Sequence, residues 1–189
     1  MRILLHTCCA PCATVPIRAL QSDSHNIVAY FHNPNIHPAT EFANRLASVL
    51  KLTEEWGIER IIDSAYRLDL FLGCIDGVEF DRERCARCYA MRLRRTAEMA
   101  LERGFDAFST SLLVSPYQKH ELIMSAGEEA ADEYGIAFHY EDYRADFPKT
   151  REIAGERGLY RQKYCGCIFS ESERYAGRME KLVWKARNG

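Results

Sequence analysis

The eight cysteines of this 189-residue chain are grouped rather than scattered. Seven of them fall into three short groups and one stands alone. The groups are Cys8 and Cys9 with Cys12, Cys85 with Cys88, and Cys165 with Cys167, and the isolated residue is Cys74. Thiolates bind soft metals and iron–sulfur clusters, and closely spaced thiols also carry out redox chemistry. The pattern therefore predicts a metal or redox centre.

Cys85 and Cys88 form a CxxC pair in the first turns of a helix predicted over residues 81–103. Residues three apart project from one face of a helix, and the positive end of that helix favours thiolates. A zinc site made of four cysteines is the structural alternative, but such sites usually pair two spaced CxxC units. This chain offers an adjacent pair and a CxC instead. The four thiolates that suit a [4Fe–4S] cluster are Cys8, Cys9, Cys85 and Cys88.

Cys165 and Cys167 are separated only by Gly166. A disulfide across one residue closes a small strained ring, and strain raises the reduction potential. The pair therefore suits electron relay better than structural cross-linking. The alternatives are ligation of a second metal and two idle reduced thiols. We interpret Cys12 and Cys74 as small buried hydrophobic residues.

Composition is that of an ordinary globular protein, with 47% hydrophobic and 28% charged residues. The formal net charge of −2 gives no overall field that would attract nucleic acid, although it leaves room for a local basic patch. No apolar run approaches the length of a membrane span, and the apolar run at the N-terminus is short for a signal peptide. We therefore expect a cytoplasmic protein without a membrane partner. In that reducing compartment, metal or redox use of the cysteines is favoured over disulfides.

Strands and helices are predicted to alternate along one α/β domain spanning residues 1–189. The expected strands are 2–6, 26–32, 58–63, 105–110 and 136–140, and the expected helices are 13–21, 39–56, 81–103, 119–134 and 168–186. This alternation is typical of a doubly wound, mainly parallel five-stranded sheet. Asp81 is expected to cap the N-terminus of the third helix, and Gly104 to end it.

Ligands in such sheets bind outside the carboxyl ends of the strands, so the loop after the first strand is the expected site. That loop runs from His6 to Cys12 and carries cysteines where a phosphate-binding loop would carry glycines. A metal or thiol centre is therefore favoured over a nucleotide-phosphate site.

Four segments together resemble a known family, the cobalamin-independent epoxyqueuosine reductases of tRNA queuosine synthesis. They are LLHTCCAPC at 4–12, RCARCYAMRL at 84–93, TSLLVSPYQKH at 110–120 and YRQKYCGCIFS at 160–170. The resemblance implies a Rossmann-like fold similar to adenine-nucleotide hydrolases, with the phosphate loop replaced by the cysteine loop. It also implies a [4Fe–4S] cluster, and the positions that match its cluster motifs are Cys8, Cys9, Cys85 and Cys88.

Cys165 and Cys167 match the CGC pair of that family, which is described either as a redox-active disulfide or as ligands of an adjacent mononuclear iron. Both descriptions stay open at the sequence level. If a second metal is present, one of the four cluster thiolates is a candidate to be shared with it. The chain has Tyr117 where the family often has His or another residue, which puts a proton-donor role at that position in question.

The implied reaction removes the epoxide oxygen of epoxyqueuosine in the tRNA anticodon loop and leaves queuosine. It consumes two electrons and two protons, releases water, and requires a general acid and an electron donor that the sequence does not identify. An open iron would polarise the epoxide oxygen as a Lewis acid. The candidate acids near the motifs are Asp81, Tyr89, Tyr117 and Tyr164.

Basic residues near the motifs are expected to contact tRNA phosphates, with aromatic side chains stacking on bases. These residues are Arg82, Arg84, Arg87 and Arg92 on one predicted helix, and Arg161 and Lys163 before the CGC pair. For each arginine alone, the alternative is a solvated helix face paired with Glu. Other function classes are a different iron–sulfur tRNA-modifying enzyme, a non-catalytic zinc-stabilised module and a small electron-transfer protein.

Overall fold

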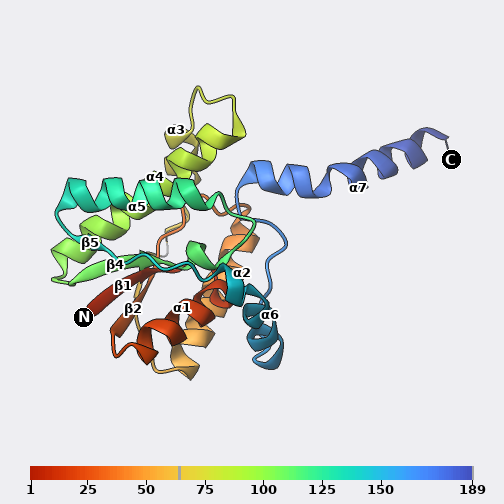
Figure 1. Cartoon of the computed structure of the whole chain (residues 1–189). Helices are drawn as coiled ribbons and strands as arrows, with labels where there is room; N and C mark the ends of the chain where they lie inside the picture. The colour runs from red at the N-terminus through yellow and green to blue at the C-terminus, as the bar shows by residue number, and fades with distance from the viewer. Residues whose placement is uncertain (64, 189) are drawn as a thin grey trace.

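A parallel five-stranded sheet lies at the centre of the molecule (Figure 1), and the computed structural model describes residues 1–63 and 65–188. The strands are β1 (Arg2–His6), β2 (Asn26–Phe31), β3 (Glu59–Ile62), β4 (Ala107–Thr110) and β5 (Ala137–Phe138). Their order is β3-β2-β1-β4-β5, and every neighbouring pair is parallel. This is the strand order of a Rossmann-like sheet. The predicted α/β fold with a doubly wound sheet is confirmed.

Helices cover both faces of the sheet because the strand residues alternate between the faces. Leu4 points to one face, where α4 and α5 pack, while Ile3 and Leu5 point to the other, where α1, α2 and α6 pack. The helices are α1 (Ala10–Ser22), α2 (Ala39–Glu55), α3 (Leu68–Cys74), α4 (Asp81–Glu102), α5 (His120–Tyr134), α6 (Phe147–Glu156) and α7 (Ile168–Asn188), with short 3₁₀ turns η1 (Ser111–Val114) and η2 (Arg144–Asp146).

β1 is the strand at which the order of the sheet reverses, because β2 lies on one side of it and β4 on the other. Residues 7–12 follow the carboxyl end of β1, and η1 follows the carboxyl end of β4. Both connections therefore open at the edge of the sheet where ligands bind in this class of fold.

Helix boundaries differ from the predictions at several places. α1 begins at Ala10 rather than at residue 13, with Pro11 in its first turn, where a missing N–H is tolerated. Asp81 is the first residue of α4 rather than its cap, which is Phe80. α3 and α6 were not predicted, and β5 is limited to two residues.

α7 extends away from the sheet and its covering helices in Figure 1, and the helix contains no buried residue. It is as long as a helix that crosses a bilayer, but it carries many charged residues. Among residues 1–63 and 65–188, no helix combines the length and the apolar character that a membrane span needs.

Candidate metal and redox centre

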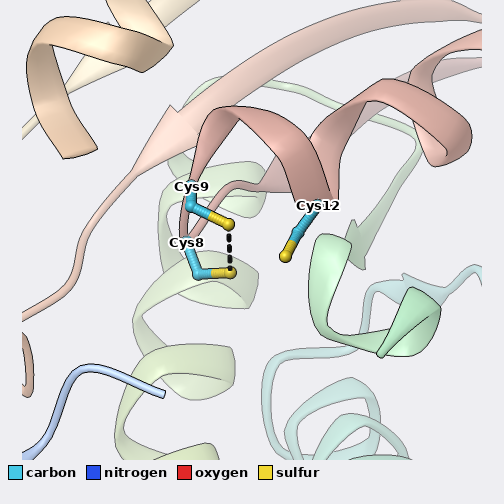
Figure 2. A group of neighbouring side chains, drawn as sticks. All are labelled: Cys8, Cys9 and Cys12. Carbon is cyan, nitrogen blue, oxygen red and sulfur yellow. Dashed lines mark hydrogen bonds between the residues drawn. The ribbon is translucent and has the colours of Figure 1, made fainter. Parts of the chain in front are cut away.

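Cys8, Cys9 and Cys12 lie together directly after β1 (Figure 2). All three are buried, and their Sγ atoms lie within 4.8 Å of one another. Cys9 is the N-cap of α1, and Cys12 lies in the first turn of that helix. The positive end of the helix therefore points at the sulfur atoms and favours thiolates or a bound anion. Such a group of thiols can bind a soft metal.

Cys12 belongs to this group although the sequence led us to interpret it as a small hydrophobic residue. It is buried as expected, but its Sγ faces the sulfur atoms of Cys8 and Cys9. The spacing of three residues from Cys9 would have indicated this if the helix had been predicted to start at Ala10. The presence of Pro11 moved the predicted start too far along the chain.

The pKa values of the three thiols are shifted in different directions. Hydrogen bonds with Cys12 and Cys9 hold the pKa of the Cys8 thiol well below its ordinary value. Burial raises the pKa of the Cys9 thiol, and the hydrogen bond with Cys8 raises the pKa of the Cys12 thiol. Ser111 in η1 accepts a hydrogen bond from the Cys8 backbone N–H at 3.1 Å. Within this group, ionisation of Cys8 is thus favoured over ionisation of Cys9 and Cys12.

Cys85 and Cys88 project from α4 toward the same region. Cys85 packs against the apolar cluster that contains the three N-terminal cysteines, and Cys88 is buried in a neighbouring cluster against which Cys74 and Cys167 pack. Burial raises the pKa of both thiols, to about 12 for Cys88. Burial thus outweighs the helix N-terminus that was expected to favour thiolates. Metal binding at these thiols would release protons.

Cys165 and Cys167 lie on the loop before α7, with their Sγ atoms 3.7 Å apart and not joined as a disulfide. The hydrogen bond with Cys167 lowers the pKa of Cys165 to about 5, and the same interaction raises the pKa of Cys167. Cys165 is exposed and Cys167 half-buried. The pair therefore combines an accessible thiol of lowered pKa with a neighbouring thiol, an arrangement that suits thiol–disulfide exchange.

Two buried arginines accompany the cysteines. Arg45 forms an ion pair with Glu41 at 2.7 Å, and it donates hydrogen bonds to the carbonyl oxygens of Tyr164 at 2.9 Å and Cys165 at 3.1 Å. Arg45 thereby fixes the position of the CGC loop from α2. Burial opposes the charge of Arg45, but the nearby Cys9 and Glu41 raise its pKa.

Arg92 is the second buried arginine, although the sequence predicted that it contacts tRNA phosphates. It is only 3% exposed, and its Nε donates to the Cys88 carbonyl oxygen at 3.1 Å. Burial opposes its charge, but Cys88 and Cys8 raise its pKa, so the guanidinium stays positive among the cysteines. Arg92 is therefore enclosed with the thiols and does not belong to an exposed RNA-contacting surface.

Gln162 connects the C-terminal segment to the first loop. Its Nε2 donates to Cys9 Sγ at 2.8 Å and lies 3.3 Å from Cys12 Sγ. Its Oε1 is buried, and no described residue provides it with a hydrogen-bond partner. The fold thus brings three distant parts of the chain to one place, around residues 8–12, 85–88 and 162–167.

The predicted acid Asp81 is exposed and paired with Lys119 at 2.7 Å. The hydrogen bond from Lys119 lowers the pKa of Asp81 and raises that of Lys119, so the proton of this pair resides on Lys119. The Lys119 charge also acts to lower the pKa of Cys85, which places the ammonium near the CxxC pair. Lys119 was not among the sequence-predicted site residues, and only its place in the TSLLVSPYQKH segment draws attention to it.

The three predicted tyrosines lie in different environments. Tyr117 is 74% exposed, and its hydroxyl accepts a hydrogen bond from Arg151. Tyr89 is buried, which raises its pKa, and its hydroxyl donates to Gln118 at 2.8 Å. Tyr164 donates to the His37 carbonyl oxygen at 2.7 Å, and burial raises its pKa.

Of the basic residues expected to contact RNA, Arg82 and Arg87 pair with glutamates, and the others have different surroundings. Arg82 lies 3.8 Å from Glu121, and Arg87 lies 2.8 Å from Glu83, as the alternative of a solvated, Glu-paired helix face anticipates. Arg84 lies over the ring of Phe169 at 4.2 Å, next to the start of α7. Arg161 and Lys163 are exposed on the loop that leads to the CGC pair.

Relatives of known name match most of the chain. It is 38% identical over 92% of its length to an epoxyqueuosine reductase QueH from Dehalococcoides mccartyi, of which 94% is covered. It is 36% identical over 95% of its length to the protein of that name from Acinetobacter baylyi, of which 85% is covered. A structural neighbour, the U34-tRNA thiolase NcsA from Methanococcus maripaludis with its [4Fe-4S] cluster, is 13% identical with a TM-score of 0.44, covering 97% of this chain and 72% of that one. Likeness at that level says nothing about what this chain binds.

The match of a family model covers nearly the whole α/β sheet and all three cysteine groups. The family described as "Epoxyqueuosine reductase QueH" matches residues 3–173. The match ends shortly after α7 begins, so most of α7 lies beyond it. Together with the identities of 36% and 38% to named relatives, it shows that the chain belongs to the epoxyqueuosine reductase QueH family.

Proposed function

We propose that this protein reduces epoxyqueuosine in tRNA to queuosine. The observation that carries the proposal is the group of Cys8, Cys9 and Cys12 beside the strand at which the sheet order reverses, in a chain of the epoxyqueuosine reductase family. The reaction breaks both C–O bonds of the epoxide, forms a C=C bond and releases the oxygen as water. It takes up two electrons and two protons, so the site needs an electron source and an acid.

A [4Fe–4S] cluster is proposed as the electron source, held by Cys8, Cys9, Cys85 and Cys88. The donor set fits such a group because the thiols are buried or half-buried, the Sγ atoms of Cys8 and Cys9 lie 3.7 Å apart, and Arg45 and Arg92 offset negative charge. When bound, such a cluster supplies electrons one at a time. The cysteines hold it and the two arginines stabilise their thiolates.

Cys165 and Cys167 are proposed as the second redox element. As a dithiol, the pair gives up two electrons and two protons when it closes to a disulfide, which balances the reduction of one epoxide. As ligands, the same two thiolates hold a single iron beside the cluster. The ratio of iron to acid-labile sulfide distinguishes the two arrangements, because an additional iron raises it above one.

Lys119 is proposed to supply a proton at the rim of the site. Its Nζ holds the proton of the Asp81–Lys119 pair and lies near Cys85. Asp81 then positions the ammonium rather than acting as the acid, because its carboxylate is ionised. Tyr117 is the other exposed donor, and its role is proposed as contact with substrate.

Binding of tRNA is proposed at the surface around these residues. Arg84, Arg161 and Lys163 supply positive charge for phosphates, and Phe80 and Tyr117 are 72% and 74% exposed aromatic side chains. Exposed aromatic rings beside basic groups suit unstacked bases of a single-stranded loop. The natural electron donor is a separate partner, unidentified by these features.

Cluster loading tests the proposal. We expect protein purified without oxygen to contain iron and sulfide, and Cys9→Ser and Cys85→Ser to lose both. Cys74→Ser is the matched control and retains them, because Cys74 is outside the proposed ligand set. Cys12→Ser should lose less iron than Cys9→Ser, and an equal loss would put Cys12 among the ligands. Stoichiometric zinc without sulfide in the wild type would contradict the proposal.

Turnover separates the redox pair from the cluster. We expect Cys167→Ser to keep its sulfide and its visible absorption but to stop deoxygenation of tRNA that carries epoxyqueuosine, followed by mass spectrometry of the released nucleosides. Full activity in this variant would remove the proposed role of the CGC pair.

A further inference from the structure

Within the described part of the chain, the apolar side of α7 is contacted near its start, where the ring of Tyr175 meets that of Tyr164, and the rest of this side is exposed. Met179 is 56% exposed and Leu182 51% exposed, and a groove of about 640 Å³ runs along this side from Ile168 to Leu182. Figure 1 shows the helix projecting clear of the sheet and its other helices. The side is a continuous stripe, because its residues recur at alternating steps of four and three along the helix.

A helix with an exposed apolar side needs a packing partner to be stable in water. Isolated helices gain little in water, and most helical stability in proteins comes from packing of the apolar face. No residue of α7 is buried, and Gly177 in its middle costs about 1 kcal/mol relative to alanine. The stripe is therefore an interaction surface.

We propose that α7 pairs in antiparallel orientation with α7 of a second copy of this chain. In the register that places Tyr175 against Met179 of the copy, large residues meet small ones at the flanking positions. Leu182 then lies against Ser172 of the copy, and Ile168 lies against its Ala186. A parallel pair would instead place Ser172 and Ala186 each against itself and leave gaps in the packing.

Charges beside the stripe agree with the same register. Glu171 lies opposite Lys185 of the copy, and the symmetry of the pair forms this contact twice. Arg178 is the exception, since it faces its own counterpart across the symmetry axis. The face itself is apolar, so it suits a second helix better than an RNA backbone, which requires basic residues across the contact.

Mass in solution tests the pairing with the full chain. We expect light scattering in the micromolar range to give twice the monomer mass of 21.7 kDa. Leu182→Ser should give the monomer mass, while Trp184→Ser, a change on the opposite side of the helix, should leave the dimer intact. Circular dichroism checks that both variants keep the folded sheet domain. A monomer at every concentration would overturn the proposal, as would equal effects of the two variants.

Charge exchange tests the orientation and the occupant. Glu171→Lys and Lys185→Glu should each weaken association about tenfold, and the double exchange should restore it. Arg178→Ala should strengthen association, because it removes the repulsion at the axis. In a parallel pair Glu171 and Lys185 lie far apart, so failure of the double exchange to restore association would overturn the antiparallel arrangement. A mass increase that occurs only with added tRNA would identify RNA as the occupant and overturn the pairing.

Discussion

Gly166 separates the two cysteines of the CGC pair and adopts a φ of +119°, a backbone conformation that residues other than glycine rarely adopt. A Cβ added there would approach Ile36 Cγ1 to 3.0 Å and Arg45 Nη1 to 3.2 Å. Arg45 also holds the Cys165 carbonyl oxygen, so any shift of the guanidinium moves the cysteine pair. A glycine is therefore required at position 166 to hold the thiols of Cys165 and Cys167 where they lie.

From this geometry we expect Gly166→Ala to lower the free energy of unfolding by roughly 1–3 kcal/mol, measured by urea denaturation. The reactivity of Cys165 toward an alkylating reagent should change in the same variant. Gly155→Ala in α6 is the matched control, because nothing lies within 4 Å of its added Cβ. That change should be neutral or stabilise by up to about 1 kcal/mol. Equal losses in the two variants would refute the argument.

The sequence predicted that Cys8 and Cys9 lie together after β1, but it did not predict the groups that contact the cysteines. Arg45, Gln162 and Lys119 each act on residues that are far away in the sequence, for example Gln162 on Cys9. No local sequence pattern predicts such contacts, since they form only once the sheet has folded. Arg92 shows the opposite error, because its helix neighbours suggested an exposed position while its own face of α4 is buried.

Elements with a strong hydrophobic period were predictable, whereas helices α3 and α6 were not predicted. β1, β2 and the long helices α2, α4 and α5 lie close to their predicted bounds because buried residues recur along them. α3 has only seven residues, and α6 carries a proline that normally suggests a break, although in its first turn proline is tolerated. β5 is short because the chain leaves the sheet edge after Phe138.

At the end of β2, His32 makes the fold sensitive to acid. Its Nδ1 lies 2.8 Å from the Asp63 carboxylate, yet burial outweighs this contact and lowers its pKa below 6.5. The unfolded histidine titrates near 6.5, so below that pH the unfolded chain binds more protons than the folded one. The stability is thus present above about pH 6.5 and is lost as the pH falls toward the folded pKa.

Urea midpoints at several pH values check this expectation. The wild type should lose stability as the pH falls below about 6.5, and His32→Gln, which removes the titrating group, should lose less. His120→Gln on α5 should act in the same direction, because burial lowers the pKa of His120 as well. Parallel curves for the wild type and His32→Gln would show that this histidine contributes nothing.

On the whole molecule, the net charge of −2 predicts no general attraction to tRNA, so affinity must come from local groups. Arg161→Ala and Lys163→Ala should each weaken tRNA binding and reduce the slope of log affinity against log salt by about one. Arg103→Ala, at the far end of α4, is the control and should leave both unchanged. Filter binding or fluorescence anisotropy across salt concentrations measures this. If neither variant changes the slope of log affinity against log salt, the loop that carries Arg161 and Lys163 does not contact RNA.

The contact between Gln162 and Cys9 has a consequence for how the protein is made. The first cysteines are synthesised before the loop that encloses them, because Gln162 follows Cys12 by about 150 residues in the chain. At about 5–20 residues per second, roughly ten to thirty seconds separate the synthesis of Cys12 from that of Cys165. During that interval the nascent chain carries uncovered thiols. A chain truncated before Gln162 would lack the amide that contacts Cys9 and Cys12, and it would leave these thiols more open to oxidation.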